Sequence, residues 1–177
     1  SGDGESRLSS SPWAAARRER QFATYLNPMQ ICMPLGSPKQ AYSPGIMRVL
    51  QTPGFVFILN DYSHTYRITP TDGRPHVGPA IHLYEGDTRG RWEGNTLVVD
   101  ITNYNDKGWI ATSAATQRVK GIHISEKLHV VERFTRVDAD TLMYEVTIDD
   151  PEAYERPWKV SIPLSRDPEY KIYEYAC

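Results

Sequence analysis

The stretch that decides the fold is Trp92-Glu93-Gly94-Asn95-Thr96-Leu97-Val98-Val99-Asp100-Ile101-Thr102-Asn103. Gly94-Asn95 is a two-residue turn signal, and apolar side chains then alternate along residues 96–102. A period of two after a Gly-Asn turn predicts a β-hairpin whose second strand has one apolar face. Asp100 and Thr102 belong to the other face. Whether that face meets water or lines a pocket decides which chemistry is available.

The bulk composition is that of one globular domain. The chain has 177 residues, of which 40% are hydrophobic and 24% charged. A net charge of -2 and a pI near 6.2 argue against a nucleic-acid-binding protein, which would carry a basic face. No apolar run approaches the roughly 20 residues of a membrane-spanning helix.

The N-terminal quarter and the rest of the chain have different patterns. Residues 1–11 are rich in Ser and Gly, which predicts a disordered tail. Residues 12–45 combine a short helix, capped by Ser11 and starting with Pro12, with a proline-rich wrapping segment. Residues 46–177 read as a single β domain without repeats.

Short strands separated by turn residues predict an antiparallel meander in this domain. We expect an up-and-down, lipocalin-like barrel of eight or nine strands that holds one small ligand, with the short helix outside it. The alternative is a pair of packed sheets. The expected strands are 46–51, 55–60, 64–69, 89–92, 96–102, 127–137, 141–149, 158–164 and 171–175.

The two cysteines, Cys32 and Cys177, favour a disulfide that ties the C-terminus to the N-terminal segment. Two unrelated thiols are the alternative. A disulfide would indicate an oxidising compartment, and we therefore expect a secreted or periplasmic protein.

Two long loops are the expected places for chemistry, residues 70–86 and 103–121. The first contains Thr71-Asp72-Gly73-Arg74-Pro75-His76. An Asp can orient a His, and an Arg can bind a carboxylate with two hydrogen bonds. The same residues can also form an ordinary turn in which Asp72 is bound by its own Arg74.

A second cluster runs from His123 through Glu126 and His129 to Glu132-Arg133. In a strand, His129 and Arg133 share one side and Glu132 lies on the other. Two His and one Glu could hold zinc, but strand geometry does not bring residues three apart onto one face, so we expect no metal site. Because motifs for nucleotide binding are absent, we also expect no cofactor. Proton transfer by one His and a purely structural role both remain open.

The third candidate is the polar strand face with Asp100 and Thr102, with which we expect Glu145 and Thr147 of another strand to align. A carboxylate that faced a barrel interior would have the raised pKa that a general acid needs. The candidate substrate-binding residues are Tyr62, Tyr66, Trp92, Asn103, Trp109 and His123, four of which offer aromatic walls for a planar ligand. Motifs for phosphate loops, dinucleotides and serine hydrolases are absent from the sequence.

Six segments together resemble a large, mostly bacterial and often secreted family of β-rich proteins: Gln51-Thr52-Pro53-Gly54, Thr71–His76, Gly90–Val99, Leu128–Phe134, Asp149–Tyr154 and Glu174–Cys177. The resemblance implies a β-rich fold and export, and it implies no activity. Relatives are typically shorter where this chain has residues 109–125, which suggests a specialised member.

The leading hypothesis is a small-molecule enzyme that uses acid/base chemistry without a cofactor, of the lyase, dehydratase, isomerase or cyclase type. His76 and His129 would transfer protons, with Asp72, Glu126 or Asp100 orienting them and Arg74 binding an anionic or carbonyl oxygen. The alternatives are an exported lipocalin-like protein that binds an aromatic or apolar ligand, and an interaction protein. Association into a homo-oligomer is left open.

Overall fold

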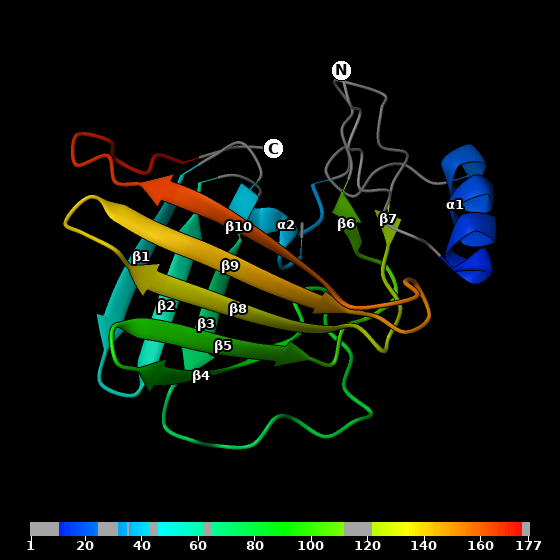
Figure 1. The fold of residues 1–177 in the computed structure, drawn as a ribbon, viewed down its shortest axis with the longest axis horizontal. Coiled ribbons are helices and arrows are strands. Elements are labelled where there is room, and N and C mark those ends of the chain that lie inside the picture. Colours follow the sequence, from blue (N-terminus) through cyan, green and yellow to red (C-terminus); the bar gives the residue numbers. More distant parts are fainter. Residues whose placement is uncertain are drawn as a thin grey trace.

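The computed structural model describes residues 11–24, 32–34, 36–42, 46–61, 65–111 and 122–174. Within them, a five-stranded antiparallel sheet lies in front of a three-stranded antiparallel sheet (Figure 1). The three-stranded sheet has the order β1-β2-β3, formed by Met47–Thr52, Phe55–Asn60 and Tyr66–Pro70. The five-stranded sheet has the order β10-β9-β8-β5-β4, formed by Trp158–Ser165, Thr141–Asp149, His129–Arg136, Thr96–Thr102 and Asp87–Glu93.

Eight of the predicted strands are confirmed, with differences of a few residues at their ends. The strand predicted over 171–175 is wrong where it is described, because 171–174 have no regular structure. The short pair β6 (Trp109–Ala111) and β7 (Ile122–His123) was not predicted. These strands are too short for their alternation to stand out in a polar loop.

The closed barrel is not found in the described residues, which instead form the two packed sheets that the meander also allowed. Among the described residues, β10 does not pair with β1 through backbone hydrogen bonds, and β3 does not pair with β4. At the second of these junctions the Thr88 hydroxyl donates to the Ile68 carbonyl at 3.0 Å, so a side chain links the two sheet edges. Loop 71–86 separates β3 from β4, and this long connection removes the tight turn that pairs neighbouring strands elsewhere in the meander.

The apolar core fills the space between the two sheets. Val56 and Ile58 enter it from β2, and the five-stranded sheet contributes alternate residues that are almost fully buried: Val99, Ile101, Val130, Tyr144, Val146 and Ile148. Such alternation is what one buried sheet face requires. Because Leu97, Val99 and Ile101 point into the core, Asp100 and Thr102 point away from it.

Helix α1 contacts β7 beyond one end of the sheets, whereas helix α2 contacts β6 and lies behind β10 (Figure 1). Helix α1, Pro12–Thr24, begins as predicted, because the Ser11 hydroxyl accepts a hydrogen bond from Ala14 N at 3.1 Å. Helix α2, Lys39–Tyr42, is one turn in the segment that was expected to be irregular. No helix among the described residues is long and apolar enough to cross a membrane.

Two predictions concern residues that the structure does not describe. The expected disordered tail occupies residues 1–10 and Ser11, of which only Ser11 is described. The expected disulfide needs Cys177, which also lies outside the described residues, so the Cys32–Cys177 pairing stays a prediction.

Candidate active site

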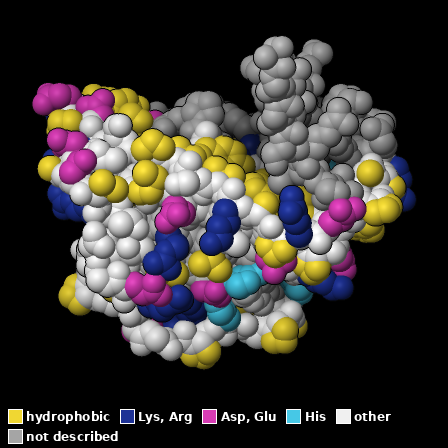
Figure 2. All heavy atoms as spheres, in the orientation of Figure 1, with side chains coloured by type: hydrophobic (Ala, Val, Ile, Leu, Met, Phe, Trp, Pro, Cys, Tyr) yellow, Lys and Arg dark blue, Asp and Glu magenta, His cyan; other side chains and the backbone are white. Residues whose placement is uncertain are grey.

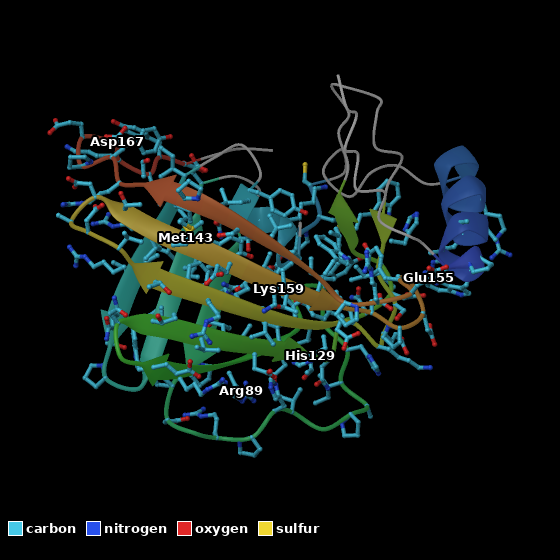
Figure 3. The ribbon with its side chains drawn as sticks, in the orientation of Figure 1. Arg89, His129, Met143, Glu155, Lys159 and Asp167 are labelled. Atoms are coloured by element: carbon cyan, nitrogen blue, oxygen red, sulfur yellow. The ribbon has the colours of Figure 1, made fainter. Side chains whose placement is uncertain are left out.

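A row of five polar side chains crosses one end of the outer face of the five-stranded sheet, which is the face that points away from the three-stranded sheet. We call it the His–Asp network: Arg89, Asp87, His76, Asp100 and His129. Figure 2 shows His side chains on this face among Lys, Arg, Asp and Glu. Arg89 and His129 project from neighbouring parts of the sheet in Figure 3.

The strand register brings the network together. The two-residue turn at Gly94-Asn95 pairs Arg89 with Asp100 directly across β4 and β5. On the other side of β5, Asp100 pairs with Val131, so His129 projects from the same face two residues earlier on β8. Thr147 lies in the same cross-strand row as Asp100 and Val131, which confirms the predicted alignment of these polar faces.

Asp100 binds both histidines of the network. Its Oδ1 atom is 2.9 Å from Nε2 of His76, and its Oδ2 atom is 2.8 Å from Nε2 of His129. Burial alone would raise the pKa of Asp100. The hydrogen bonds and charges of His129 and His76 outweigh this effect, and they hold the pKa below its ordinary value. Asp100 is therefore a carboxylate over the whole neutral range.

His76 is fixed at both ring nitrogens. Its Nδ1 atom is 2.8 Å from Asp87 Oδ2, while its Nε2 atom faces Asp100. Both contacts are hydrogen bonds only when both nitrogens carry hydrogen, which is the imidazolium form. Asp87 in turn accepts from Arg89 Nη1 at 2.8 Å and from the backbone N of Val77 at 3.0 Å.

His129 differs from His76 because one of its nitrogens stays open. No described contact involves Nδ1, and 43% of the side chain is exposed. When Nε2 donates to Asp100, the lone pair lies on Nδ1 and points to solvent. An imidazole oriented by a carboxylate in this way is the arrangement of a general base.

Loop 71–86 places His76 over the sheet. Arg89 Nε donates to the carbonyl of Pro75 at 2.7 Å. Further along, the Asn103 amide donates to the carbonyls of Gly78 at 3.1 Å and Ile81 at 3.0 Å. Asn103, a predicted substrate-binding residue, therefore holds the loop that carries His76.

The structure leaves several predicted site residues outside the network. Asp72 and Arg74 bind each other, with Nε–Oδ distances of 2.9 and 3.0 Å, and hydrogen bonds from Arg74 lower the pKa of Asp72 to about 2. The guanidinium also lies 5.2 Å from the Phe55 ring centroid. This is the ordinary turn, with Asp72 bound by its own Arg74, that was the alternative interpretation of these residues. Glu126 is exposed and lies 4.0 Å from His82.

The predicted aromatic walls are dispersed. Tyr66 and Trp92 are 64% and 47% exposed on other parts of the molecule. Trp109 packs edge-on against His123 at 4.6 Å, and His123 is buried. Tyr62 lies outside the described residues.

Asp87 and Arg89 are the network residues that sequence reasoning missed. The Gly94-Asn95 turn sets a register in which Arg89 faces Asp100, so the sequence did contain a signal for Arg89. Among the described residues, no group of three His, Cys, Asp or Glu side chains is arranged to hold a metal ion.

The barrel cavity expected for this chemistry is not where the network lies. Asp100 and Thr102 point outward, because the apolar partners that alternate with them fill the core. Of the two orientations that the sequence left open for this face, the structure has the outward one, and His129 lies beside Asp100 there. Comparisons with protein-family models, curated proteins and solved structures find no match. The resemblance to a secreted bacterial family thus stays a prediction.

Proposed function

We propose that the protein is an enzyme that moves a proton on a small molecule without a cofactor, with His129 as the general base. The observation that carries this proposal is the 2.8 Å contact between His129 Nε2 and Asp100 Oδ2, which leaves Nδ1 of the same ring open to solvent. His76 contacts Asp100, and Asp87 contacts His76. In this scheme both are positioning residues, because they hold Asp100 in place.

The arrangement favours proton abstraction over covalent chemistry. No described Ser, Thr or Cys contacts the imidazole of His129, so the base has no nucleophile to activate among these residues. A proton taken from carbon next to a carbonyl, or from a hydroxyl group, would move to Nδ1 and leave an imidazolium that Asp100 stabilises. Isomerase, lyase, dehydratase and cyclase reactions begin with such a step.

The outer face makes the base accessible to substrate. His129 lies at the start of β8, beside the half-buried Asp100, which also contacts His76 of loop 71–86. Asn103 and Arg89 hold this loop to the sheet, so the position of His76 does not depend on a bound ligand. Export to a secreted or periplasmic location is part of the proposal and rests on the resemblance and the two cysteines.

The test is hydrogen–deuterium exchange at carbon. The protein is incubated in D2O with small ketones and hydroxyketones, and NMR follows loss of the proton next to the carbonyl. We expect exchange with the unchanged protein and a loss of about 10²-fold or more in His129→Asn. His82→Asn is the matched control, because His82 Nδ1 is 3.1 Å from the Tyr104 carbonyl and lies outside the network. Equal exchange by His129→Asn and unchanged protein would remove the proposal.

A groove supports the second candidate, a non-catalytic lipocalin-like binding protein. Among the described residues, a groove of about 1090 Å³ is lined by β1, by the turn between β8 and β9, and by the end of β10 with the residues that follow it. Its walls combine apolar side chains with charged ones: Arg48, Arg136, Asp138, Asp140, Arg166, Asp167 and Lys171. It lies where a closed barrel would need β1 to pair with β10, and Val49 and Leu50 of β1 are exposed nearby. A ligand with both apolar and polar groups in this groove would raise the melting temperature without forming product, and it would do so equally in His129→Asn.

A further inference from the structure

The two sheets have four edge strands, and one of them presents an open backbone edge. The edges are β1 and β3 in the three-stranded sheet, and β10 and β4 in the five-stranded sheet. β3 and β4 contact each other, and the Thr88 hydroxyl bonds to the Ile68 carbonyl between them. β1 and the end of β10 border the groove of about 1090 Å³. An edge strand carries unpaired backbone N–H and C=O groups, and proteins normally block such edges.

The free edge of β10 is blocked by a proline. The backbone N of Arg166 donates to the Asp140 carbonyl at 2.8 Å, so every second residue back from Arg166 turns its backbone to β9. Pro163 is three residues earlier, and its backbone therefore faces away from β9. Proline has no N–H, and at this position it removes a donor from the free edge without weakening the β9–β10 pairing.

The free edge of β1 has no such block. The Ile46 carbonyl accepts from the backbone N of Asp61 at 3.1 Å, so every second residue onward from Ile46 turns its backbone to β2. The residues between them are Met47, Val49 and Gln51, and their N–H and C=O groups point outward. No described strand pairs with this edge.

The groove follows this edge. Five consecutive residues, Ile46–Leu50, line it on the β1 side. Consecutive side chains of a strand point to opposite faces, so a groove over one face would have only alternate residues in its wall. Residues 48–52 are all exposed, which means that both faces of β1 are uncovered. The backbone of β1 is therefore accessible from the groove.

One face of this edge continues the apolar core. Val49 pairs with Ile58, which is buried in the core, so Met47 and Val49 lie on the core side of the sheet. Met47 is joined in the groove wall by Leu142 and Leu164, and all three pack against the core while they stay partly exposed. Apolar side chains of an added strand would cover them.

The opposite face of β1 presents a cation. Arg48 is exposed and forms no ion pair with a described residue, and the same holds for Lys171 across the groove. Arg136, also in the groove wall, donates to the carbonyl of Asp138 at 3.1 Å and to no carboxylate. These cations are available to an acidic partner.

The three carboxylates in the groove wall already have donors. Asp138 accepts from the backbone N of Asp140 at 2.8 Å, and Asp167 accepts from the backbone N of Tyr170 at 3.2 Å. Asp140 itself lies 3.7 Å from Nη1 of Arg166. The unpaired charge of the groove is thus positive, and charge complementarity favours an occupant that carries carboxylates.

We propose that the free edge of β1 is a docking site for an extended segment of a partner protein in which apolar and acidic residues alternate. The segment adds to β1 as an antiparallel strand and bonds to the backbone of Met47, Val49 and Gln51. Its apolar side chains lie on the core side, and its acidic side chains lie beside Arg48. The proposal goes beyond proton transfer by His129 and does not depend on it.

The probe is a seven-residue peptide of alternating valine and glutamate with blocked ends, and fluorescence anisotropy measures its binding to the full chain. We expect a Kd below about 1 mM. The same peptide with lysine in place of glutamate should bind at least about tenfold more weakly. Absence of binding by the glutamate peptide, or equal binding of the two peptides, would overturn the proposal.

Two N-methylated peptides distinguish backbone pairing from side-chain contacts. Directly opposed residues of an antiparallel pair share a face, so the valines should lie opposite Met47, Val49 and Gln51 and turn their N–H groups to them. N-methylation of the valines should weaken binding by about tenfold or more, and N-methylation of the glutamates should have little effect. Equal effects of the two modifications would contradict strand addition.

Arg48→Glu tests the charge of the docking site. It should weaken binding of the glutamate peptide by about tenfold and remove the preference over the lysine peptide. Lys159→Glu is the matched control, because it changes the net charge equally on β10 at an exposed position outside the groove wall. Equal losses in both variants would show a general effect of net charge and would count against the site.

Amide hydrogen exchange tests the site without altering the protein. The N–H of Val49 faces the free edge and should gain protection when the glutamate peptide binds, whereas the N–H of Arg48 faces β2 and should change little. Unchanged exchange at Val49 at a saturating peptide concentration would overturn the proposal. A second copy of the chain is the other possible occupant. If Val49 is protected without peptide and sedimentation shows a dimer that the peptide does not dissociate, the partner segment is ruled out.

Discussion

His129 Nε2 and Asp100 Oδ2 are 2.8 Å apart on neighbouring antiparallel strands, although neither residue is the direct cross-strand partner of the other. The two side chains meet diagonally, since Asp100 pairs with Val131 and His129 pairs with Asp149. The contact therefore depends on side-chain direction as well as register, and His76 reaching over from loop 71–86 fixes that direction for Asp100.

Replacing Asp100 with Asn should change how stability depends on pH. The folded protein lowers the pKa of Asp100 below its ordinary value of 3.8. Its contribution to the free energy of unfolding is therefore present above that value and is lost as pH falls through the folded-state pKa. We expect Asp100→Asn to lower this free energy by about 1 kcal/mol at pH ~5, since the carboxylate is partly solvated. The difference should shrink towards pH ~2.

Urea unfolding of both proteins across this pH range provides the measurement. Glu145→Gln is the control, because Glu145 is an exposed carboxylate on the same outer face that lies outside the network. It should leave the pH dependence of the unchanged protein intact. A constant difference between Asp100→Asn and the unchanged protein from pH ~5 to pH ~2 would contradict the prediction.

Breaking the buried ion pair between Arg67 and Glu132 should lower the free energy of unfolding far more than Asp100→Asn does. In Arg67→Met, the carboxylate of Glu132 loses the guanidinium at 2.7 Å and stays buried with only two hydroxyl donors. An uncompensated buried charge costs about 3–5 kcal/mol, and we expect a loss of that size in the free energy of unfolding. Chemical denaturation at neutral pH measures it.

The double variant Arg67→Met with Glu132→Gln separates charge from packing. Removing the carboxylate together with its partner should recover a large part of the loss, because no buried charge remains. Arg74→Met is the surface control, since Arg74 pairs with Asp72 where both are exposed, and it should have little effect. A double variant no more stable than Arg67→Met would show that lost packing, not charge, sets the cost.

The sequence predicted the strands better than their assembly. Alternation along β5 and β9 and the turn at Gly94-Asn95 are local signals, and both strands formed where expected. Closure of the meander depends on whether β1 reaches β10, which no local pattern encodes. The order of the strands could thus be predicted from the sequence. The division into two sheets, in which β1 does not pair with β10, could not.

The candidate site was predicted in part for the same reason. His129 and Asp100 were singled out by residue type, and their shared face follows from the alternation of β5 and β8. His76 was named as well, but its contacts with Asp87 and Asp100 depend on the path of loop 71–86. The inter-sheet pairing of Arg67 with Glu132 joins residues 65 positions apart in different sheets, and nothing in the local sequence indicates it.

Gly86 and Gly94 form a matched pair for testing backbone strain and packing. Both have positive φ, 69° and 60°, where a residue with a Cβ is disfavoured. A Cβ on Gly86 would lie 2.7 Å from Ile101 Cγ2 and 2.9 Å from the Thr102 carbonyl oxygen, while nothing lies within 4 Å of one on Gly94. We expect Gly94→Ala to cost about 1 kcal/mol and Gly86→Ala to cost at least about 2 kcal/mol more.

Thermal and urea unfolding compare the two glycine variants. Gly86 precedes Asp87, so Gly86→Ala should also disturb the contact of Asp87 with His76 and shift the ring signals of His76 in NMR spectra. Gly94→Ala should leave those signals in place. Equal losses of stability in the two variants would mean that the chain near Gly86 relaxes, and that the close approach of Ile101 does not constrain it.

Outside the His–Asp network and the Arg67–Glu132 ion pair, Asp150 should be the carboxylate whose replacement lowers the free energy of unfolding most. It is 1% exposed, and its two oxygens accept from the backbone N and the hydroxyl of Ser125, both at 2.7 Å. The Oδ1 atom also accepts from the backbone N of Glu152 and Ala153 at 3.2 and 3.1 Å. Asp150→Ala leaves these donors buried, and we expect a loss of about 3 kcal/mol or more in the free energy of unfolding. Asp150→Asn, which keeps one acceptor oxygen, should lose less. If urea unfolding ranks Asn at or below Ala, the corner is held by packing around Ala153 and Tyr154 and not by the carboxylate.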